Sequence, residues 1–91
     1  MQLMLIIASS CRQRMLLTLA KVKKTHVTEL VRMINSTYNE VNRNLIILEE
    51  EGIIKTKRLG QLKIIELQTE SPKTVALLKA LELLDRHGTA R

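Results

Sequence analysis

Two amphipathic helical patterns are separated by only two turn-forming residues, Asn35 and Ser36, and this spacing most constrains the fold. Both residues favour turns over helix interiors, because their short polar side chains compete for backbone groups. The pattern before the break predicts a helix that starts at Thr28. Its core-facing residues are Leu30, Met33 and Ile34. Two helices joined by so short a turn are typical of a helix-turn-helix.

The pattern after the break predicts a helix from Thr37 to Glu51. Thr37 and Glu40 have the spacing of a capping box, which marks a helix start. Gly52 is suited to end the helix with a left-handed backbone conformation. The apolar residues that recur at helical spacing are Val41, Leu45 and Leu48. They define one buried face and leave the opposite face exposed.

Further elements precede this helix pair. Ser10 and Gln13 also have capping-box spacing and predict a helix to about Ala20. That helix places Met15, Leu16 and Leu19 inward, and Arg12 and Arg14 elsewhere. His26 and Val27 predict one short strand. The apolar segment from Leu3 to Ala8 fits a helix or a strand equally well, since periodicity does not separate these for so short a run.

A strand–turn–strand pattern follows the helix pair directly. Ile53 to Lys57 and Leu62 to Leu67 flank a connector, Arg58 to Gln61, that contains Gly60. A glycine in a short connector between apolar runs predicts a β-hairpin. The last helix starts at Ser71-Pro72, runs from Lys73 to about Arg86 and stops at Gly88.

This order of elements predicts a mainly α fold with a small β-hairpin, a winged helix-turn-helix with additional N-terminal and C-terminal helices. We expect one domain over residues 1–91, with its core in 8–68 and a packing and dimerisation helix in 71–87.

Three stretches resemble the winged helix regulators of the arsenic-repressor (ArsR) and multiple-antibiotic-resistance (MarR) type. They are Val27-Thr28-Glu29-Leu30, the run Ser36 to Leu45, and Leu48-Glu49-Glu50-Glu51-Gly52-Ile53-Ile54. The last is the most specific, because it ends the reading helix and starts the wing. The resemblance covers about residues 8–68 and implies a DNA-binding regulator of prokaryotic or archaeal type, commonly dimeric.

All four asparagines of the chain fall between Asn35 and Asn44. Asn is a mediocre helix former, so folding alone gains little from three of them inside one helix. An Asn side chain carries a donor and an acceptor that match the adenine edge in the major groove. We therefore expect Tyr38, Asn39, Asn42 and Arg43, with the cap Thr37, to contact DNA. Arg43 suits a guanine or a phosphate, and a merely solvated polar face is the alternative interpretation.

Tyr38 is the lone aromatic residue and lies at the start of this helix. Its place beside the cap argues against full burial. Contact of its hydroxyl with a phosphate, or of its ring with a thymine methyl group, is the functional interpretation. Ordinary packing against the wing is the other.

The predicted hairpin carries a basic tip. Lys57, Arg58, Gln61 and Lys63 are expected to contact the DNA backbone or the minor groove. Charges that protect an edge strand from aggregation would give the same pattern. Thr28 and the cluster Lys21–Lys24 are further candidates for phosphate contacts.

The last helix is apolar over more than one face, so one face is free for a partner. A second copy of the chain is the simplest partner, because most oligomers are symmetric homo-oligomers. The expected interface residues are Leu3, Leu5, Val75, Leu78, Leu81 and Leu84. A twofold dimer would present two reading helices to half-sites about 34–36 Å apart. The alternative is a monomer with a deeply embedded last helix.

Charge and composition narrow the class of protein. A formal net charge of +6 favours a polyanionic partner, either nucleic acid or an acidic membrane surface. Cys11 is the only cysteine, which fits a reducing cytoplasm, and the apolar N-terminal run is too short to span a bilayer. His26 and His87 are far apart, so no metal-ligand spacing appears, unlike in metal-sensing relatives of the resembling families. No catalytic motif is visible, so we expect neither an enzyme nor a cofactor.

Together these features predict a sequence-specific, dimeric double-stranded DNA-binding protein that regulates transcription in the cytoplasm, at the nucleoid. Two alternatives remain: a winged helix that docks into a protein assembly, and a non-specific architectural DNA-binding protein. A protein-interaction module would not bind random duplex DNA. An architectural protein would bind DNA tightly but without a sequence preference.

Overall fold

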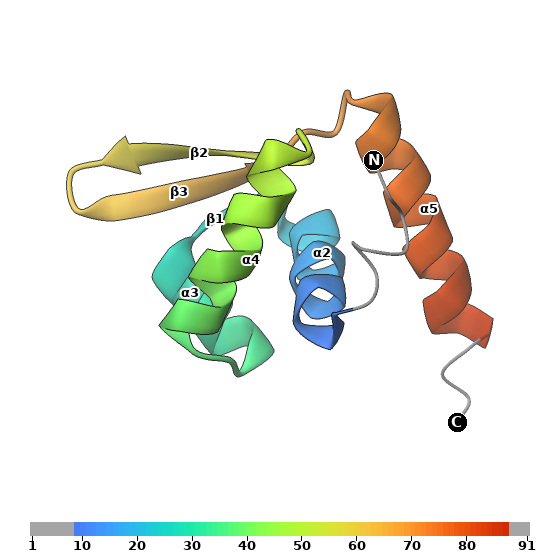
Figure 1. The fold of residues 1–91 in the computed structure, drawn as a ribbon, viewed down its shortest axis with the longest axis horizontal. Helices are drawn as coiled ribbons and strands as arrows, with labels where there is room; N and C mark the ends of the chain where they lie inside the picture. The colour runs from blue at the N-terminus through green and yellow to red at the C-terminus, as the bar shows by residue number, and fades with distance from the viewer. Residues whose placement is uncertain (1–8, 88–91) are drawn as a thin grey trace.

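The computed structural model describes residues 9–87, with side chains as far as Leu83 (Figure 1). Its elements are α2 (Ser10–Val22), β1 (Lys24–His26), α3 (Val27–Ile34), α4 (Tyr38–Glu50), β2 (Ile54–Leu59), β3 (Leu62–Leu67) and α5 (Pro72–His87). α2 contacts α3, α4 and α5, so it is the central helix. In Figure 1 the hairpin of β2 and β3 projects to one side of the helices, and α5 lies on the other side of α2. This arrangement is the predicted winged helix-turn-helix.

The three strands form one antiparallel sheet in the order β1-β3-β2. β1 joins the hairpin through the pairs Lys24–Glu66, Thr25–Ile65 and His26–Ile64. Ile65 is fully buried and directs one face of the sheet toward the helices. The sheet therefore anchors the base of the wing in the core, while the paired residues beyond Ile64 extend away from it.

The core is aliphatic, as a chain with one aromatic residue requires. Fully buried side chains come from each of the four described helices, from both wing strands and from Ile53 just before β2: Met15, Leu16, Leu19, Leu30, Val41, Leu45, Leu48, Ile53, Ile54, Ile65 and Leu77. Each contributes about 1.5–3 kcal/mol relative to an exposed position. The predicted inward faces of α2 and α4 are confirmed, so these two helices cross with their apolar stripes in contact.

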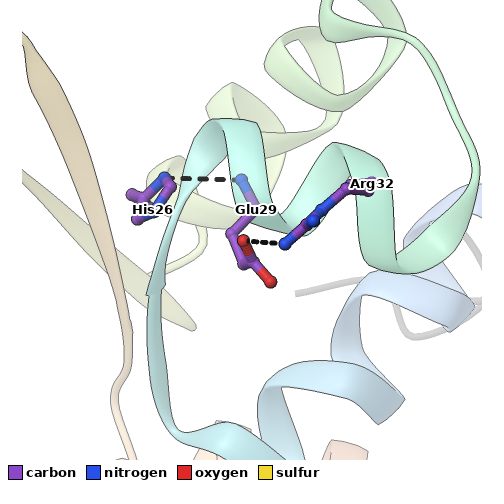
Figure 2. Close-up of polar contacts among 3 residues, drawn as sticks. All are labelled: His26, Glu29 and Arg32. Atoms are coloured by element: carbon purple, nitrogen blue, oxygen red, sulfur yellow. Dashed lines mark hydrogen bonds and ion pairs between the residues drawn. The ribbon is translucent and has the colours of Figure 1, made fainter.

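Three predicted features of the helix starts need correction. α2 is capped by Ser9, whose hydroxyl accepts from the Arg12 amide at 3.2 Å, and not by Ser10. The short strand ends at His26 rather than Val27. α3 starts at Val27 and not at Thr28, with His26 as its cap. Figure 2 shows the His26 Nδ1 atom accepting from the Glu29 amide at 3.4 Å.

Two predicted side-chain positions are also wrong. Met33 is 40% exposed, because the buried face of α3 runs through Val27, Leu30 and Ile34 and is centred away from Met33. Arg12 was expected outside the core but is 9% exposed. Burial of its guanidinium is tolerated because the guanidinium donates a hydrogen bond to the Asn44 side chain of α4.

The signals of Gly52, Gly60 and Pro72 are confirmed, with α5 starting at Pro72, whereas the predicted stop at Gly88 lies outside the described residues. Gly52 has φ +75°, and the Gly52 and Ile53 amides donate to the carbonyls of Glu49 and Leu48, the pattern of a Schellman motif. Gly60 has φ +62° in a two-residue loop between Leu59 and Leu62. A positive φ at the first loop residue suits a primed hairpin turn, which matches the twist of the strands.

Candidate nucleic-acid interface

A tightly bonded turn sets the position of α4. Asn35 ends α3 in the left-handed conformation, with φ +57°. The Ser36 amide donates to the Val31 carbonyl at 3.1 Å, and the Ser36 hydroxyl donates to the Glu40 carboxylate at 2.7 Å. Thr37 Oγ1 accepts from the Glu40 amide at 3.1 Å, which confirms the predicted cap. Because both ends of the turn are bonded, α4 has one defined angle to α3.

The first two turns of α4 present a polar face to solvent. Thr37, Asn39 and Arg43 are exposed and Asn42 is half-buried. Tyr38 is 51% exposed, because it lies at the helix end beyond the reach of the core. The predicted recognition-helix residues therefore lie together on the accessible surface of the first two turns of α4.

The four asparagines differ in burial and in hydrogen bonding, and only the structure reveals these differences. Asn44 is 7% exposed: its Oδ1 accepts from Arg12 Nη1 at 3.1 Å, and its Nδ2 donates to the Glu40 carbonyl at 2.8 Å. Asn35 supplies the left-handed cap of α3. The predicted turn role of Asn35 is confirmed, whereas the interpretation that folding gains little from the asparagines inside the helix is wrong for Asn44. Asn39 and Asn42 remain as the asparagines that α4 presents at its surface.

Two side-chain contacts join α4 to the wing. Lys63 Nζ donates to Asn42 Oδ1 at 3.4 Å, and the Thr56 hydroxyl donates to the Glu49 carboxylate at 3.0 Å. The contacts lie two turns apart on α4 and involve both wing strands. The wing and the exposed face of α4 are consequently parts of one continuous surface.

The wing is basic and exposed near its tip. Lys57, Arg58 and Gln61 are exposed, and Lys63 is half-buried. Arg58 and Lys63 are paired directly across the hairpin. Like charges at such positions destabilise a sheet, and an anion between them would relieve the repulsion. The tip also exposes Leu59 and Leu62, a cross-strand apolar pair that the sequence reasoning did not single out.

The other predicted phosphate ligands do not form one patch with α4. Lys23 Nζ donates to the Ala20 carbonyl at 2.7 Å, and Lys21 and Lys23 border a groove beside α5. Lys24 instead faces a small hollow on the sheet with Lys55 and Lys57. Thr28 is exposed in the first turn of α3, next to the Glu29–Arg32 ion pair shown in Figure 2.

An apolar groove of about 470 Å³ lies between α2 and α5. Its apolar lining includes Leu17, Ala20, Val75 and Leu78. Val75 is 46% exposed, whereas Leu81 is buried in the core of the same chain and has no surface left for a partner. Of the other predicted interface residues, Leu3 and Leu5 lie outside the described residues, as does the side chain of Leu84.

Cys11 is buried beside Met15, with its Sγ 3.9 Å from Met15 Sδ and 3.9 Å from Ser36 Oγ. Within residues 9–87, no group of three or more His, Cys, Asp or Glu side chains is placed to hold a metal ion. Over the same part of the chain, no helix has the length and apolar character needed to cross a membrane.

A bonded helix-turn-helix, followed directly by a β-hairpin in a three-stranded sheet, defines the winged helix-turn-helix class of protein. The sequence matches no family model and no curated protein. Solved structures do match. AntR, an antimony-specific transcriptional repressor, is 26% identical at a TM-score of 0.75, over 89% of this chain and 68% of that one.

Two bacterial structures share the same fold at lower identity. The transcriptional repressor BigR from Xylella fastidiosa is 24% identical with a TM-score of 0.75, over 90% of this chain and 81% of that one. HlyU from Vibrio cholerae is 24% identical with a TM-score of 0.73, over 92% and 85%. The chain thus has an ArsR-like winged helix-turn-helix fold, and the similarity to AntR supports a DNA-binding transcriptional regulator.

Proposed function

We propose that this protein binds double-stranded DNA sequence-specifically and regulates transcription. The observation that carries the proposal is the polar face of α4. In the first two turns of α4 this face is exposed, and the Lys63–Asn42 contact joins it to a basic wing. The Thr56–Glu49 contact joins the last turn of α4 to the same wing. A helix presented in this way enters the major groove, while the wing lies on the backbone or in the minor groove.

The exposed side chains divide into two groups by chemistry. Asn39, Asn42 and Arg43 suit base edges, at about 1–3 kcal/mol of discrimination for each good bidentate contact. Thr37 and Tyr38, at the positive end of α4, suit phosphates. On the wing, Lys57, Arg58, Gln61 and Lys63 suit the backbone. Among these wing residues, Arg58 and Lys63 give the strongest support for a backbone contact, since their facing charges favour an anion between them.

A second copy of the chain would complete the regulator. The groove between α2 and α5, with the exposed Val75 and the half-buried Leu78, is an apolar surface that a partner helix fits. The apolar residues Leu3, Leu5 and Leu84 stay predicted members of this interface. Twofold symmetry would place two α4 helices on half-sites one DNA turn apart, as in other dimeric helix-turn-helix proteins. Such a regulator would act at the nucleoid in the cytoplasm.

Selection of bound duplexes from a random pool, followed by sequencing, tests the proposal. A palindromic consensus is the expected result. Binding without a consensus would reject sequence-specific reading in favour of an architectural role. No retained duplex in moderate salt would reject DNA binding and favour a protein-interaction module.

Variants of α4 then locate the reading residues. Replacing both Asn39 and Asn42 with Ala should reduce discrimination between the selected and a random duplex more than it reduces binding to the random one. Equal losses on both duplexes would exclude these two asparagines from base contact.

A further inference from the structure

Ile46 is an apolar side chain in the middle of the exposed face of α4. It is 52% exposed, although Leu45 and Leu48 on the same helix are fully buried. Asn39, Arg43 and Ile46 are four and three residues apart, so they lie on one face of the helix. The sequence pattern did not single out Ile46, and the structure places it outside the core.

The fold gains little from an isoleucine at this position. A branched side chain at an exposed helix position is a poorer helix former than Ala, Leu, Glu or Lys. Single exposed apolar residues are common on proteins, so exposure alone decides nothing. A role for Ile46 in binding is indicated by its neighbours, because the same helix face carries Asn39 and Arg43, which are proposed to enter the major groove.

The major groove offers one apolar group, the 5-methyl of thymine. Asn39 lies two turns before Ile46, about 10 Å along the helix axis. Glu50 lies one turn after Ile46 and is exposed, and its carboxylate is repelled by DNA phosphates. Ile46 is therefore the last residue of this face that suits the groove.

Building on the proposed DNA-binding function, we propose that Ile46 is a specificity-determining residue that contacts the methyl group of a thymine. The recognised half-site then contains a thymine at the position facing the third turn of α4. Removal of that one methyl group weakens binding, while the hydrogen-bonding edge of the base stays the same.

The test uses the full chain and the duplex selected from the random pool. Each thymine is replaced in turn by deoxyuridine, which lacks only the 5-methyl group. At one thymine of each half-site the wild-type affinity should fall about fourfold, the value that burial of one such carbon group gives. Ile46→Ala should bind the thymine duplex more weakly and show a thymine-to-deoxyuridine ratio close to one at that position.

Two controls separate this contact from general effects. Met33→Ala removes an exposed apolar side chain of α3 and should keep the fourfold ratio of the wild type. Ile46→Gln restores helix propensity without an apolar group and should lose the ratio as Ile46→Ala does. Wild-type binding that is insensitive to deoxyuridine at every thymine would overturn the inference, as would an unchanged ratio in both Ile46 variants. Either result leaves the selected consensus, and with it the proposed function, intact.

Discussion

Asn44 and Asn39 lie five residues apart on α4, and the structure predicts opposite consequences when each is replaced by Ala. Asn44 is buried, accepts from the Arg12 guanidinium and donates to a backbone carbonyl. A hydrogen bond to a charged group contributes about 1.5–3 kcal/mol, and a buried partner left short of an acceptor adds to the loss. We expect Asn44→Ala to reduce the free energy of unfolding by about 2–3 kcal/mol. The melting temperature should fall by about 10 °C or more.

Asn39 is the matched control, because it is exposed on the same helix. Asn39→Ala should stay within about 0.5 kcal/mol of the wild type in stability. It should instead lose about 1–3 kcal/mol of discrimination between selected and random duplex. Asn44→Ala, assayed well below its melting temperature, should keep that discrimination.

Urea unfolding of both variants at equal protein concentration measures the stability term, and duplex titration measures the binding term. A cycle through Arg12→Met, Asn44→Leu and the double variant isolates the coupling between the two side chains, expected at about 0.5–3 kcal/mol. The reasoning is refuted if Asn44→Ala is as stable as the wild type. It is equally refuted if Asn39→Ala unfolds as easily as Asn44→Ala does.

Three further predictions concern the wing, a helix cap and the groove. Arg58→Ala should weaken binding to all duplexes similarly and reduce the slope of log affinity against log salt by about one. An unchanged slope in a salt titration would show that Arg58 does not contact a phosphate. Thr37→Ala should lower the free energy of unfolding by about 1 kcal/mol, whereas Thr37→Ser keeps an acceptor and should retain most of it in urea melts. Val75→Glu should leave a folded monomer by sedimentation and circular dichroism; a dimer that persists with the charge in place contradicts the proposed interface.

Prediction from the sequence succeeded where the determinants are local. The Thr37 cap, the Asn35–Ser36 break, the left-handed Gly52 and the start of α5 at Pro72 all appear as expected. Caps, glycines and prolines act on backbone groups only a few residues away. Their effects can therefore be predicted from a short stretch of sequence. The sequence did not distinguish Ser9 from Ser10 as the cap of α2, because adjacent serines are equally good acceptors.

Prediction failed where a partner is distant in sequence. Arg12 was placed outside by its charge, but its acceptor Asn44 belongs to another helix. Met33 was placed inside for a different, local reason: the start of α3 was set one residue too late, whereas its buried face runs through Val27, Leu30 and Ile34. The contact between Arg12 and Asn44 is not visible in a window of one helix.

The sequence by itself determined the order of helices, turn and hairpin, and hence the winged helix-turn-helix, because its stop and start signals act over three or four residues. The tertiary structure decided which of four neighbouring asparagines hold the fold and which two remain for a partner. It also decided that Ile46 lies among them at the surface. Those assignments depend on how α2, α4 and the wing pack against each other, and packing is a property of surfaces that the chain brings together only when it folds.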